Sequence, residues 1–213
     1  MKYLVMLCFT CIGIASQSQT IQDFFSDKAG TVIWLGIDYT HVRLVGEFTH
    51  FKDAGPISAE EMRDKYFPAW NSLVLSEAAK YDFKGMFMLS ALVPDIGMVT
   101  SLNATTDLTQ MNNTNAARLG CPEIKRIVSA YDLKEQEGVG IILVAENMNK
   151  SIEMAKYFVA VFNLKTREVL LCEEVNEKAG GIGIRNYWAG TLYNLVKDGK
   201  KNLYWIWKDK YVK

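Results

Sequence analysis

Two segments of the chain are apolar on both faces of a strand. Residues 31–39 read TVIWLGIDY and residues 138–146 read GVGIILVAE. Successive side chains of a strand point to opposite faces of its sheet, so strands with these sequences must be covered on both sides. This requirement predicts a sheet with other layers of structure packed above and below it. Residues 41–48 either extend the first strand or form a neighbouring one.

A helix is expected between these two strands. Ser58 and Glu61 have the spacing of a capping box, in which the serine side chain accepts a hydrogen bond from the backbone of the glutamate. Apolar residues at helical spacing follow through residues 62–73, and the pattern ends near residue 81. Pro68 lies inside the pattern and must kink the helix or begin a second one, because proline has no N–H to donate.

The middle of the chain gives a weaker pattern. Residues 85–106 are apolar but contain Pro94 and Gly97, which predicts one or two short strands around residues 98–102. Pro122 lies in the first turn of the next helical pattern, where proline is well tolerated. The apolar residues of this helix fall at i, i+3, i+4 and i+7, namely Ile124, Ile127, Val128 and Tyr131.

The last third of the chain predicts a hairpin followed by a helix. Residues 157–164 and 168–175 resemble strands and flank a short polar turn. A glycine-rich segment then leads into a helix with Ile184, Trp188, Leu192 and Leu195 on one face. Residues 202–213 form either a last edge strand or an extension that packs its aromatic residues on the body.

These patterns together predict one layered domain over residues 19–213. Its fold class is α/β to α+β, with a mixed sheet, helices packed on the sheet, and a late β-hairpin followed by a C-terminal helix. The order of strands between residues 85 and 120 does not follow from the sequence.

Residues 1–18 have the character of a secretory signal peptide. A lysine precedes an apolar run from residue 3 to residue 15, and small residues end the segment. Cleavage near Ser18 would place the mature protein in the periplasm or outside the cell. Cys11 could instead carry the lipid of a lipoprotein, but the bulky Phe9 close before it argues against that. No other apolar run is long enough for an integral membrane span.

The charge balance limits the partners. The chain has 24 Lys and Arg residues and 24 Asp and Glu residues, so loss of Lys2 with the signal peptide would leave 23 against 24. This balance argues against nucleic acid or an anionic membrane as the main partner. The mature chain would keep Cys121 and Cys172, either as one disulfide or as two buried thiols, and we expect the thiols.

The sequence contains no familiar catalytic or metal-binding pattern. Its two histidines are His41 and His50, and a zinc site needs more ligands at closer spacing. A nucleophile elbow, a phosphate loop and a dinucleotide fingerprint are absent from the sequence. We therefore expect no catalytic residue, no metal and no cofactor. Asp38 interrupts a buried strand near its C-terminal end, where α/β sheets tend to bind ligands, although a residue in that position often only caps a turn.

Residues 178–190, KAGGIGIRNYWAG, contain the strongest candidate for a ligand site. Gly180, Gly181 and Gly183 precede a helix, whose free N–H groups and dipole can bind an anion. Arg185 and Asn186 would be polar anchors for it, with Asp38 nearby. The Lys-Ser or Lys-Thr pair of a phosphate loop is missing, and glycine is equally needed in a joint between a strand and a helix.

Arg185 also raises a question of charge. A cation in the first turn of a helix is opposed by the helix dipole, so it needs a compensating negative charge. We expect a carboxylate in a structural ion pair, in preference to a bound anion.

The stretch YFVAVFNLKTREVLLCEEVNEKAGGIGIRNYWAG resembles a group of uncharacterised exported proteins of the Bacteroidetes, in which a G-G-x-G-x-R-N-Y-W-A segment follows a strand hairpin. WLGIDYTHVRLVG, IVSAYDL and GVGIILVAE are similar to the same group. The resemblance implies the envelope of a Gram-negative bacterium and no particular activity. The order of elements is also similar to that of the α/β domain of the TolB N-terminal and curli-secretion lipoprotein families, from which no residue role is carried over.

Two hypotheses about function follow. The first is a non-enzymatic envelope protein that acts through contact with a protein partner or with itself. It rests on aromatic residues beyond the needs of a core, such as Tyr204, Trp205 and Trp207. The alternative is a binder or enzyme for a small anionic ligand at residues 180–183 and the start of the following helix.

Overall fold

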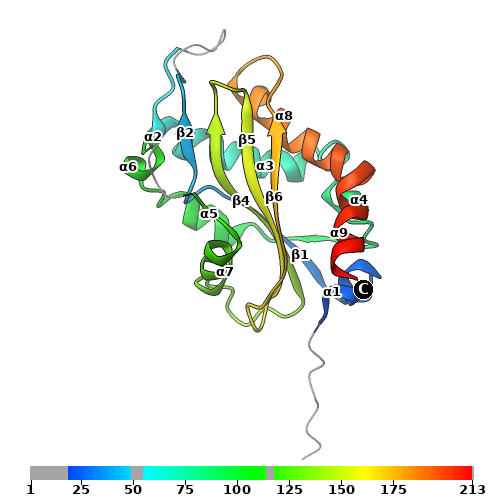
Figure 1. Cartoon of the computed structure of the whole chain (residues 1–213). Coiled ribbons are helices and arrows are strands. Elements are labelled where there is room, and N and C mark those ends of the chain that lie inside the picture. The colour runs from blue at the N-terminus through cyan, green and yellow to red at the C-terminus, as the bar shows by residue number, and fades with distance from the viewer. Residues whose placement is uncertain (1–18, 49–54, 114–117, 213) are drawn as a thin grey trace, which may run out of the picture.

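A computed structural model describes residues 19–48, 55–113 and 118–212. The signal peptide expected at residues 1–18 lies outside this part of the chain, as does His50. The described residues build one mixed sheet with helices on both faces, which confirms the fold class (Figure 1). Its strands are β1 (Val32–Asp38), β2 (Arg43–Val45), β3 (Val93–Pro94), β4 (Val139–Asn149), β5 (Met154–Asn163) and β6 (Val169–Lys178).

The sheet has a parallel part and an antiparallel part. Its strand order is β3-β1-β4-β5-β6, and β2 pairs with β4 beyond the end of β1. The strands β1 and β2 run parallel to β4, and β3 runs parallel to β1, whereas β5 and β6 form the expected antiparallel hairpin. All seven residues of β1 are buried, as its apolar sequence on both faces requires.

Helices cover both faces of the sheet. One face packs against α1 (Ile21–Phe25), α3 (Phe67–Ser76), α4 (Phe83–Met86), α8 (Ile184–Asp198) and α9 (Tyr204–Tyr211). The other face packs against α5 (Gly97–Asn103) and α7 (Cys121–Ser129). Figure 1 shows α5 and α7 to the lower left of the strands and α4, α8 and α9 to their right.

Two asparagine side chains take the place of a strand beside β1. The strand β3 pairs only with Ile33 and Trp34, so the backbone beyond them needs other partners. Asn71, from α3, accepts a hydrogen bond from the N–H of Ile37 at 2.8 Å and donates to its carbonyl at 3.0 Å. Asn103, from α5, accepts from the N–H of Tyr39 at 2.7 Å. Both side-chain amides are buried. They occupy backbone groups with which a neighbouring strand would otherwise pair.

The expected capped helix is present, with an irregular turn inside it. Ser58 accepts a hydrogen bond from the N–H of Glu61 at 3.0 Å, and the helix runs through α2 (Ala59–Glu61), the π-helical turn η1 (Met62–Tyr66) and α3. The π turn ends just before Pro68, which lies in the first turn of α3. The wider turn lets the chain pass the proline, which has no N–H for the helical ladder. The helix ends at Ser76, before the expected residue 81.

The prediction of strands around residues 98–102 is wrong, because these residues belong to helix α5. Two hydroxyl groups in this helix are bonded to carbonyls one turn earlier: the side chain of Thr100 donates to the carbonyl of Ile96 at 2.8 Å, and that of Ser101 donates to the carbonyl of Gly97 at 3.2 Å. Val99 is buried against the sheet. The short helix α6 (Leu108–Met111) follows.

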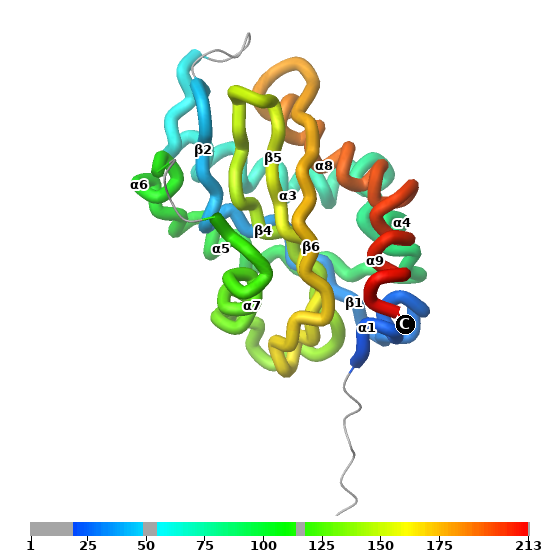
Figure 2. Tube along the Cα trace, in the orientation of Figure 1, coloured from blue at the N-terminus to red at the C-terminus, as the bar shows by residue number. Residues whose placement is uncertain are grey.

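The edge strand considered for the C-terminal tail is also wrong. The chain continues from α8 through the π-helical turn η2 (Gly199–Leu203) into α9, which ends beside α1 (Figure 2). Tyr204, Trp207 and Tyr211 fall at i, i+3 and i+7, so one face of α9 packs inward. Tyr204 donates to the carbonyl of Phe25 at 3.2 Å. The packing of tail aromatics on the body is therefore confirmed for this face.

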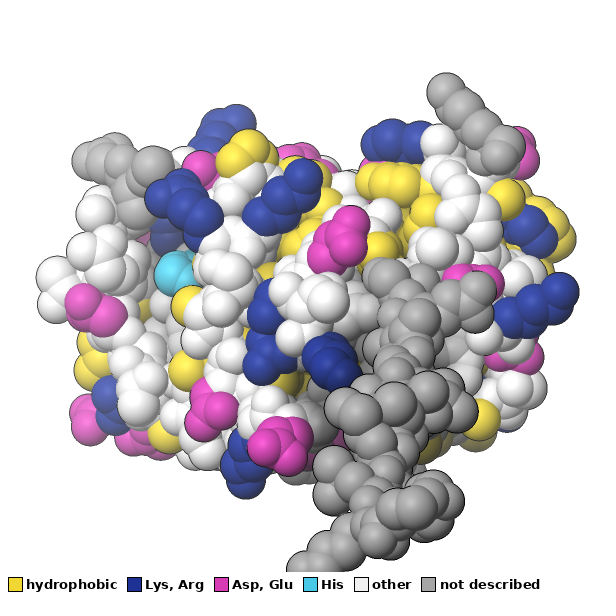
Figure 3. All heavy atoms as spheres, turned by 90° about the horizontal axis from the view of Figure 1, so that it is seen from below, with side chains coloured by type: hydrophobic (Ala, Val, Ile, Leu, Met, Phe, Trp, Pro, Cys, Tyr) yellow, Lys and Arg dark blue, Asp and Glu magenta, His cyan; other side chains and the backbone are white. Residues whose placement is uncertain are grey.

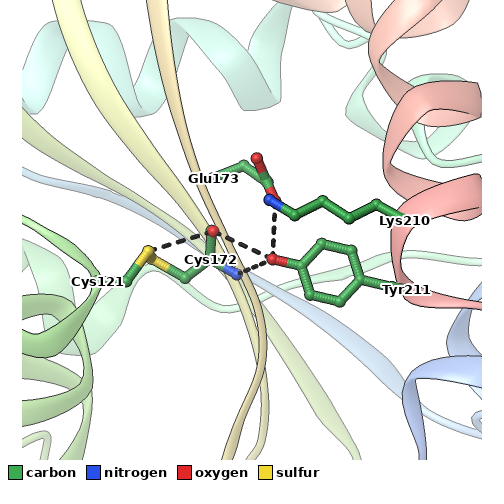
Figure 4. The surroundings of a disulfide bond; sticks show 5 residues. All are labelled: Cys121, Cys172, Glu173, Lys210 and Tyr211. Carbon is green, nitrogen blue, oxygen red and sulfur yellow. Dashed lines mark hydrogen bonds and ion pairs between the residues drawn. A yellow bond between two sulfur atoms is a disulfide. The ribbon is translucent and has the colours of Figure 1, made fainter.

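The expectation of two free thiols is wrong as well. Cys121, at the start of α7, and Cys172, in β6, form a disulfide with their Cα atoms 5.9 Å apart. The helix and the strand lie against each other, which brings two residues distant in sequence within bonding range. Figure 4 shows Tyr211 on the other side of Cys172, where its hydroxyl lies 3.2 Å from the backbone carbonyl of that residue.

Candidate functional site

The glycine-rich segment is a tightly built joint between β6 and α8. Gly181 and Gly183 have φ angles of 128° and 80°, a region that side chains strongly disfavour. Gly183 occupies the N-cap position of α8, and no side chain caps this helix start. The backbone conformation alone thus explains two of the three glycines.

Helix α8 folds back on the joint. The N–H of Gly180 donates to the carbonyl of Tyr187 at 2.9 Å, so this amide is already paired. Gly190 lies one turn farther along, and a Cβ atom there would overlap the carbonyl of Gly180. Ile184 and Trp188 are buried beneath the joint. These contacts explain the glycine-rich segment as a structural connection between β6 and α8.

Arg185 has the carboxylate partner expected for it. Its guanidinium lies 3.9 Å from Glu77, which follows α3, and both side chains are nearly half exposed. An ion pair in that setting contributes little, about 0–1 kcal/mol. The backbone carbonyl of Arg185 accepts a hydrogen bond from the indole N–H of Trp70 at 2.8 Å. Asn186 is exposed.

Asp38 is a buried structural carboxylate. It accepts hydrogen bonds from the N–H of Thr40 at 2.8 Å and from the hydroxyl of Tyr131 at 2.6 Å. Burial, together with the charge of Asp38, raises the pKa of Tyr131 well above its ordinary value, so the phenol remains a donor. Asp38 therefore ties the end of β1 to the loop after α7.

The structure does not bring Asp38 and the glycine segment together. Tyr131, the partner of Asp38, belongs to the core on the α5 and α7 face of the sheet. The glycine segment begins α8, whose buried residues belong to the core on the opposite face. The polar residues proposed for one anion site thus lie on two sides of the sheet.

A pocket that the sequence did not indicate lies between α3, α4 and β3. We call it the Trp34 pocket; its volume is about 520 Å³. It is lined mainly by apolar residues: Trp34, Val74, Leu75, Ala78, Ala79, Tyr81, Asp82, Phe83, Lys84, Leu92 and Pro94. A cavity of this size and character is typical of small-molecule sites.

The indole of Trp34 forms part of the wall of this pocket and has an unpaired donor. Trp34 is 2% exposed and stacks on Phe83 with ring centroids 4.2 Å apart. Within the described residues its Nε1 has no hydrogen-bond partner. An unsatisfied buried donor is costly, about 1–3 kcal/mol, and such groups are rare in native proteins.

A second pocket, of about 350 Å³, lies on the other face between α5 and the loop after α7. It is more polar, with Asp95, Asp132 and Gln136 among its lining residues. The amide N–H of Gln136 donates to Asp95 at 2.6 Å, which fixes this side chain across the pocket. Neither pocket is lined by residues of the glycine segment.

The outer face of α9 carries two large apolar side chains. Trp205 is 48% exposed and Ile206 is 58% exposed, whereas Tyr204 and Trp207 anchor the helix from its inner face. The ammonium group of Lys208 lies 5.7 Å from the ring centre of Trp205. On the face of the molecule seen from below, positive and negative side chains are interspersed and apolar ones reach the surface between them (Figure 3).

Comparison with known proteins adds no assignment. No protein-family model, curated protein or solved structure matches this chain. Among the described residues, no group of three or more His, Cys, Asp and Glu side chains is placed to hold a metal ion. The same residues include no helix with the length and apolar character needed to cross a membrane.

Proposed function

We propose that this protein is an exported, non-catalytic component of a bacterial cell envelope that acts by contact with another protein. The observation that carries the proposal is the outer face of α9, where Trp205 and Ile206 expose about half of their surface. Tyr204 and Trp207 hold the helix in place, so neither exposed side chain is needed to fix it. Tryptophan is strongly enriched among the residues that dominate binding at protein interfaces.

The disulfide supports the cellular location in this proposal. Disulfides persist in oxidising compartments such as the periplasm and are rare in the reducing cytosol. Cys121 and Cys172 are joined in the folded chain. A bridge of this kind fits a protein exported through the signal peptide that residues 1–18 resemble.

Site-specific photo-crosslinking tests the proposed contact. A benzophenone amino acid is placed at position 205 or 206, and the full chain is expressed with its own leader in a bacterium of the group it resembles. We expect a discrete adduct after irradiation of intact cells. An adduct of twice the mass identifies a second copy, and any other mass identifies a different protein.

Ile152 provides the matched control, because it is another exposed isoleucine, 64% exposed, in the turn between β4 and β5. The probe at position 152 should give no adduct. The change Trp205→Ala should reduce the yield from position 206 by about tenfold or more if Trp205 is a central contact. Absence of an adduct at 205 and 206 in exported, folded protein, or the same adducts at 152, would disprove the proposal.

A further inference from the structure

We propose that the disulfide between Cys121 and Cys172 is a redox switch for the last turn of α9. Reduction of the bridge releases this turn from β6 and weakens binding at the outer face of α9. The effect on binding rests on the proposed function, whereas the link between the bridge and α9 is tested without a partner.

The last turn of α9 is held on β6 at Cys172 (Figure 4). The hydroxyl of Tyr211 accepts a hydrogen bond from the N–H of Cys172 at 3.4 Å. The same hydroxyl lies 3.2 Å from the carbonyl of Cys172 and 2.7 Å from the carboxylate of Glu173, and its single proton serves one of these acceptors at a time. Lys210 donates to that carboxylate at 2.6 Å. These contacts all depend on where Cys172 and Glu173 lie.

The strand β6 has weak support from its own sheet at this point. It lies at the edge of the sheet, and among the described strands it pairs only with β5. The register of this pairing shifts between Val161 and Phe162, so the ladder is irregular just before Cys172. The side chain of Cys172 is bonded to Cys121 at the start of α7. The bridge therefore fixes the strand residue whose backbone Tyr211 contacts.

Reduction removes this support and leaves the rest of both helices packed. Ile124 and Val128 hold α7 on the sheet, and Tyr204 and Trp207 hold the first part of α9; all four side chains are buried. Two sulfur atoms that are no longer bonded must move apart to van der Waals contact. The expected result is a local release of Cys172 and of the last turn of α9, with both helices still in place.

The last turn also contacts the outer face of α9. The ammonium of Lys208, in that turn, lies 5.7 Å from the ring centre of Trp205. Tyr211 follows Trp205 by less than two helical turns. Loss of order in the last turn therefore removes a neighbour of Trp205 and adds an entropic cost to any partner that binds there.

Thiol–disulfide exchange with a dithiol performs the reduction. One thiolate of the dithiol attacks the sulfur of Cys121, the more exposed of the two cysteines, and the sulfur of Cys172 leaves. The second thiol of the reagent then displaces Cys121 from the mixed disulfide. Two electrons and two protons pass to the two cysteines, and the dithiol becomes a disulfide. The oxidised reagent reverses both steps.

Backbone relaxation measured by nuclear magnetic resonance tests the link on the purified mature protein. In the oxidised parent, residues 208–211 should be as well ordered as α8. After reduction with dithiothreitol their order parameters should fall to about 0.6 or below, while α8 keeps its order. The double change Cys121→Ala and Cys172→Ala should show the loosened turn without reductant and should not respond to it.

Linkage supplies an independent test, because coupling acts in both directions. If the bridge favours the contact of Tyr211, the contact favours the bridge by the same factor. Tyr211→Phe should therefore be half reduced at a ratio of reduced to oxidised dithiothreitol about two- to tenfold lower than the parent. Tyr193→Phe is the matched control, because Tyr193 is a tyrosine of α8 that is 41% exposed, and it should titrate like the parent.

Photo-crosslinking from position 206 tests the effect on binding. The double cysteine variant should give severalfold less adduct than the parent at equal amounts of exported protein. Absence of an adduct in the parent overturns the proposed function, and the effect on binding with it. Equal adducts from the parent and the variant overturn the effect on binding alone.

The switch itself is overturned by any of three results. The first is a last turn of α9 that is equally ordered in the oxidised and reduced parent. The second is a Tyr211→Phe variant that titrates like the parent. The third is a reduced parent that loses the dispersed indole signals of Trp34, Trp70 and Trp188, because a switch requires a folded reduced state.

Discussion

Glu177 is a buried carboxyl group that titrates near neutral pH. It lies in β6 and is 9% exposed; burial and then the negative charge of Asp198 raise its pKa from 4.5 to about 7. The folded chain therefore binds a proton at Glu177 more tightly than the unfolded chain does. This linkage contributes stability that is fully present below pH 4.5 and is lost as the pH rises to about 7.

The change Glu177→Gln should therefore stabilise the protein at high pH only. At pH 8 we expect the free energy of unfolding to rise by about 1–2 kcal/mol, because glutamine cannot acquire the unfavourable buried charge. At pH 4.5 the variant and the parent should agree within about 0.5 kcal/mol. Urea denaturation at both pH values measures the difference, and an equal effect at both would show that the carboxyl group does not titrate in this way.

Asn71 is the residue that replaces strand pairing beside β1. The change Asn71→Ala leaves the N–H of buried Ile37 without its acceptor, so we expect the free energy of unfolding to fall by about 1–3 kcal/mol. Asn186→Ala is the matched control, since Asn186 is exposed, and it should change stability by less than about 0.5 kcal/mol. Urea denaturation reports both values, and similar losses in the two variants would contradict the role of Asn71.

At the scale of elements, α8 packs so closely on the joint between β6 and α8 that position 190 of the helix requires glycine. Alanine is ordinarily better than glycine inside a helix by about 1 kcal/mol. At position 190 a Cβ atom would overlap the backbone of Gly180. The close approach of α8 to the joint therefore reverses the usual preference.

The change Gly190→Ala should lower the free energy of unfolding by about 1–3 kcal/mol, as expected for overpacking. Gly97, in α5, is the matched control, because a Cβ atom there would make only an ordinary contact of 3.4 Å with Asp95. Gly97→Ala should be neutral or slightly stabilising. Thermal unfolding of both variants provides the measurement, and a stabilising Gly190→Ala would mean that α8 does not press on the joint.

Elements with strong local patterns could be predicted from the sequence, and elements that depend on distant partners could not. The strand at residues 31–39 and the hairpin were recognisable from apolar periodicity. Helix α5 was missed because Pro94 and Gly97 suggest turns, while the helix is stabilised by its packing on β1, which the sequence does not show. The tail was ambiguous because its sequence does not show which side chains turn inward. The inward face is defined only in the fold, where Tyr204 contacts α1.

The same distinction applies to the candidate sites: features set by the local sequence could be predicted, and features built from distant residues could not. The ion pair of Arg185 was predictable from the helix dipole, although its partner Glu77 was not. The Trp34 pocket was not predictable, because its lining residues come from β1, α3, α4, β3 and the loops before and after α4, and they meet only in the folded chain. In the sequence, Trp34 is simply one apolar residue of a buried strand.

At the scale of the whole molecule, the disulfide joins the helix layer to the sheet. Cys121 and Cys172 are 51 residues apart and close a loop that contains all of β4 and β5. Closing a loop of this length restricts the unfolded chain and stabilises the folded one by up to about 4 kcal/mol.

Removing the bridge should therefore destabilise the protein without changing its fold. The double change Cys121→Ala and Cys172→Ala should lower the free energy of unfolding by about 2–4 kcal/mol. A reducing agent should lower the stability of the parent protein by a similar amount and leave the double variant unaffected. Urea denaturation with and without reductant makes both comparisons, and a parent protein insensitive to reductant would exclude a stabilising bridge.

The sheet edges are blocked by side chains at two places, and this limits how another molecule can approach them there. Beyond β3, the backbone of β1 is occupied by the amides of Asn71 and Asn103, and at Cys172 the outer edge of β6 is met by the hydroxyl of Tyr211. An extended peptide from another protein cannot lengthen the sheet at these two places by β-augmentation. At these two places any contact with another molecule would have to be made through side chains instead of through the backbone.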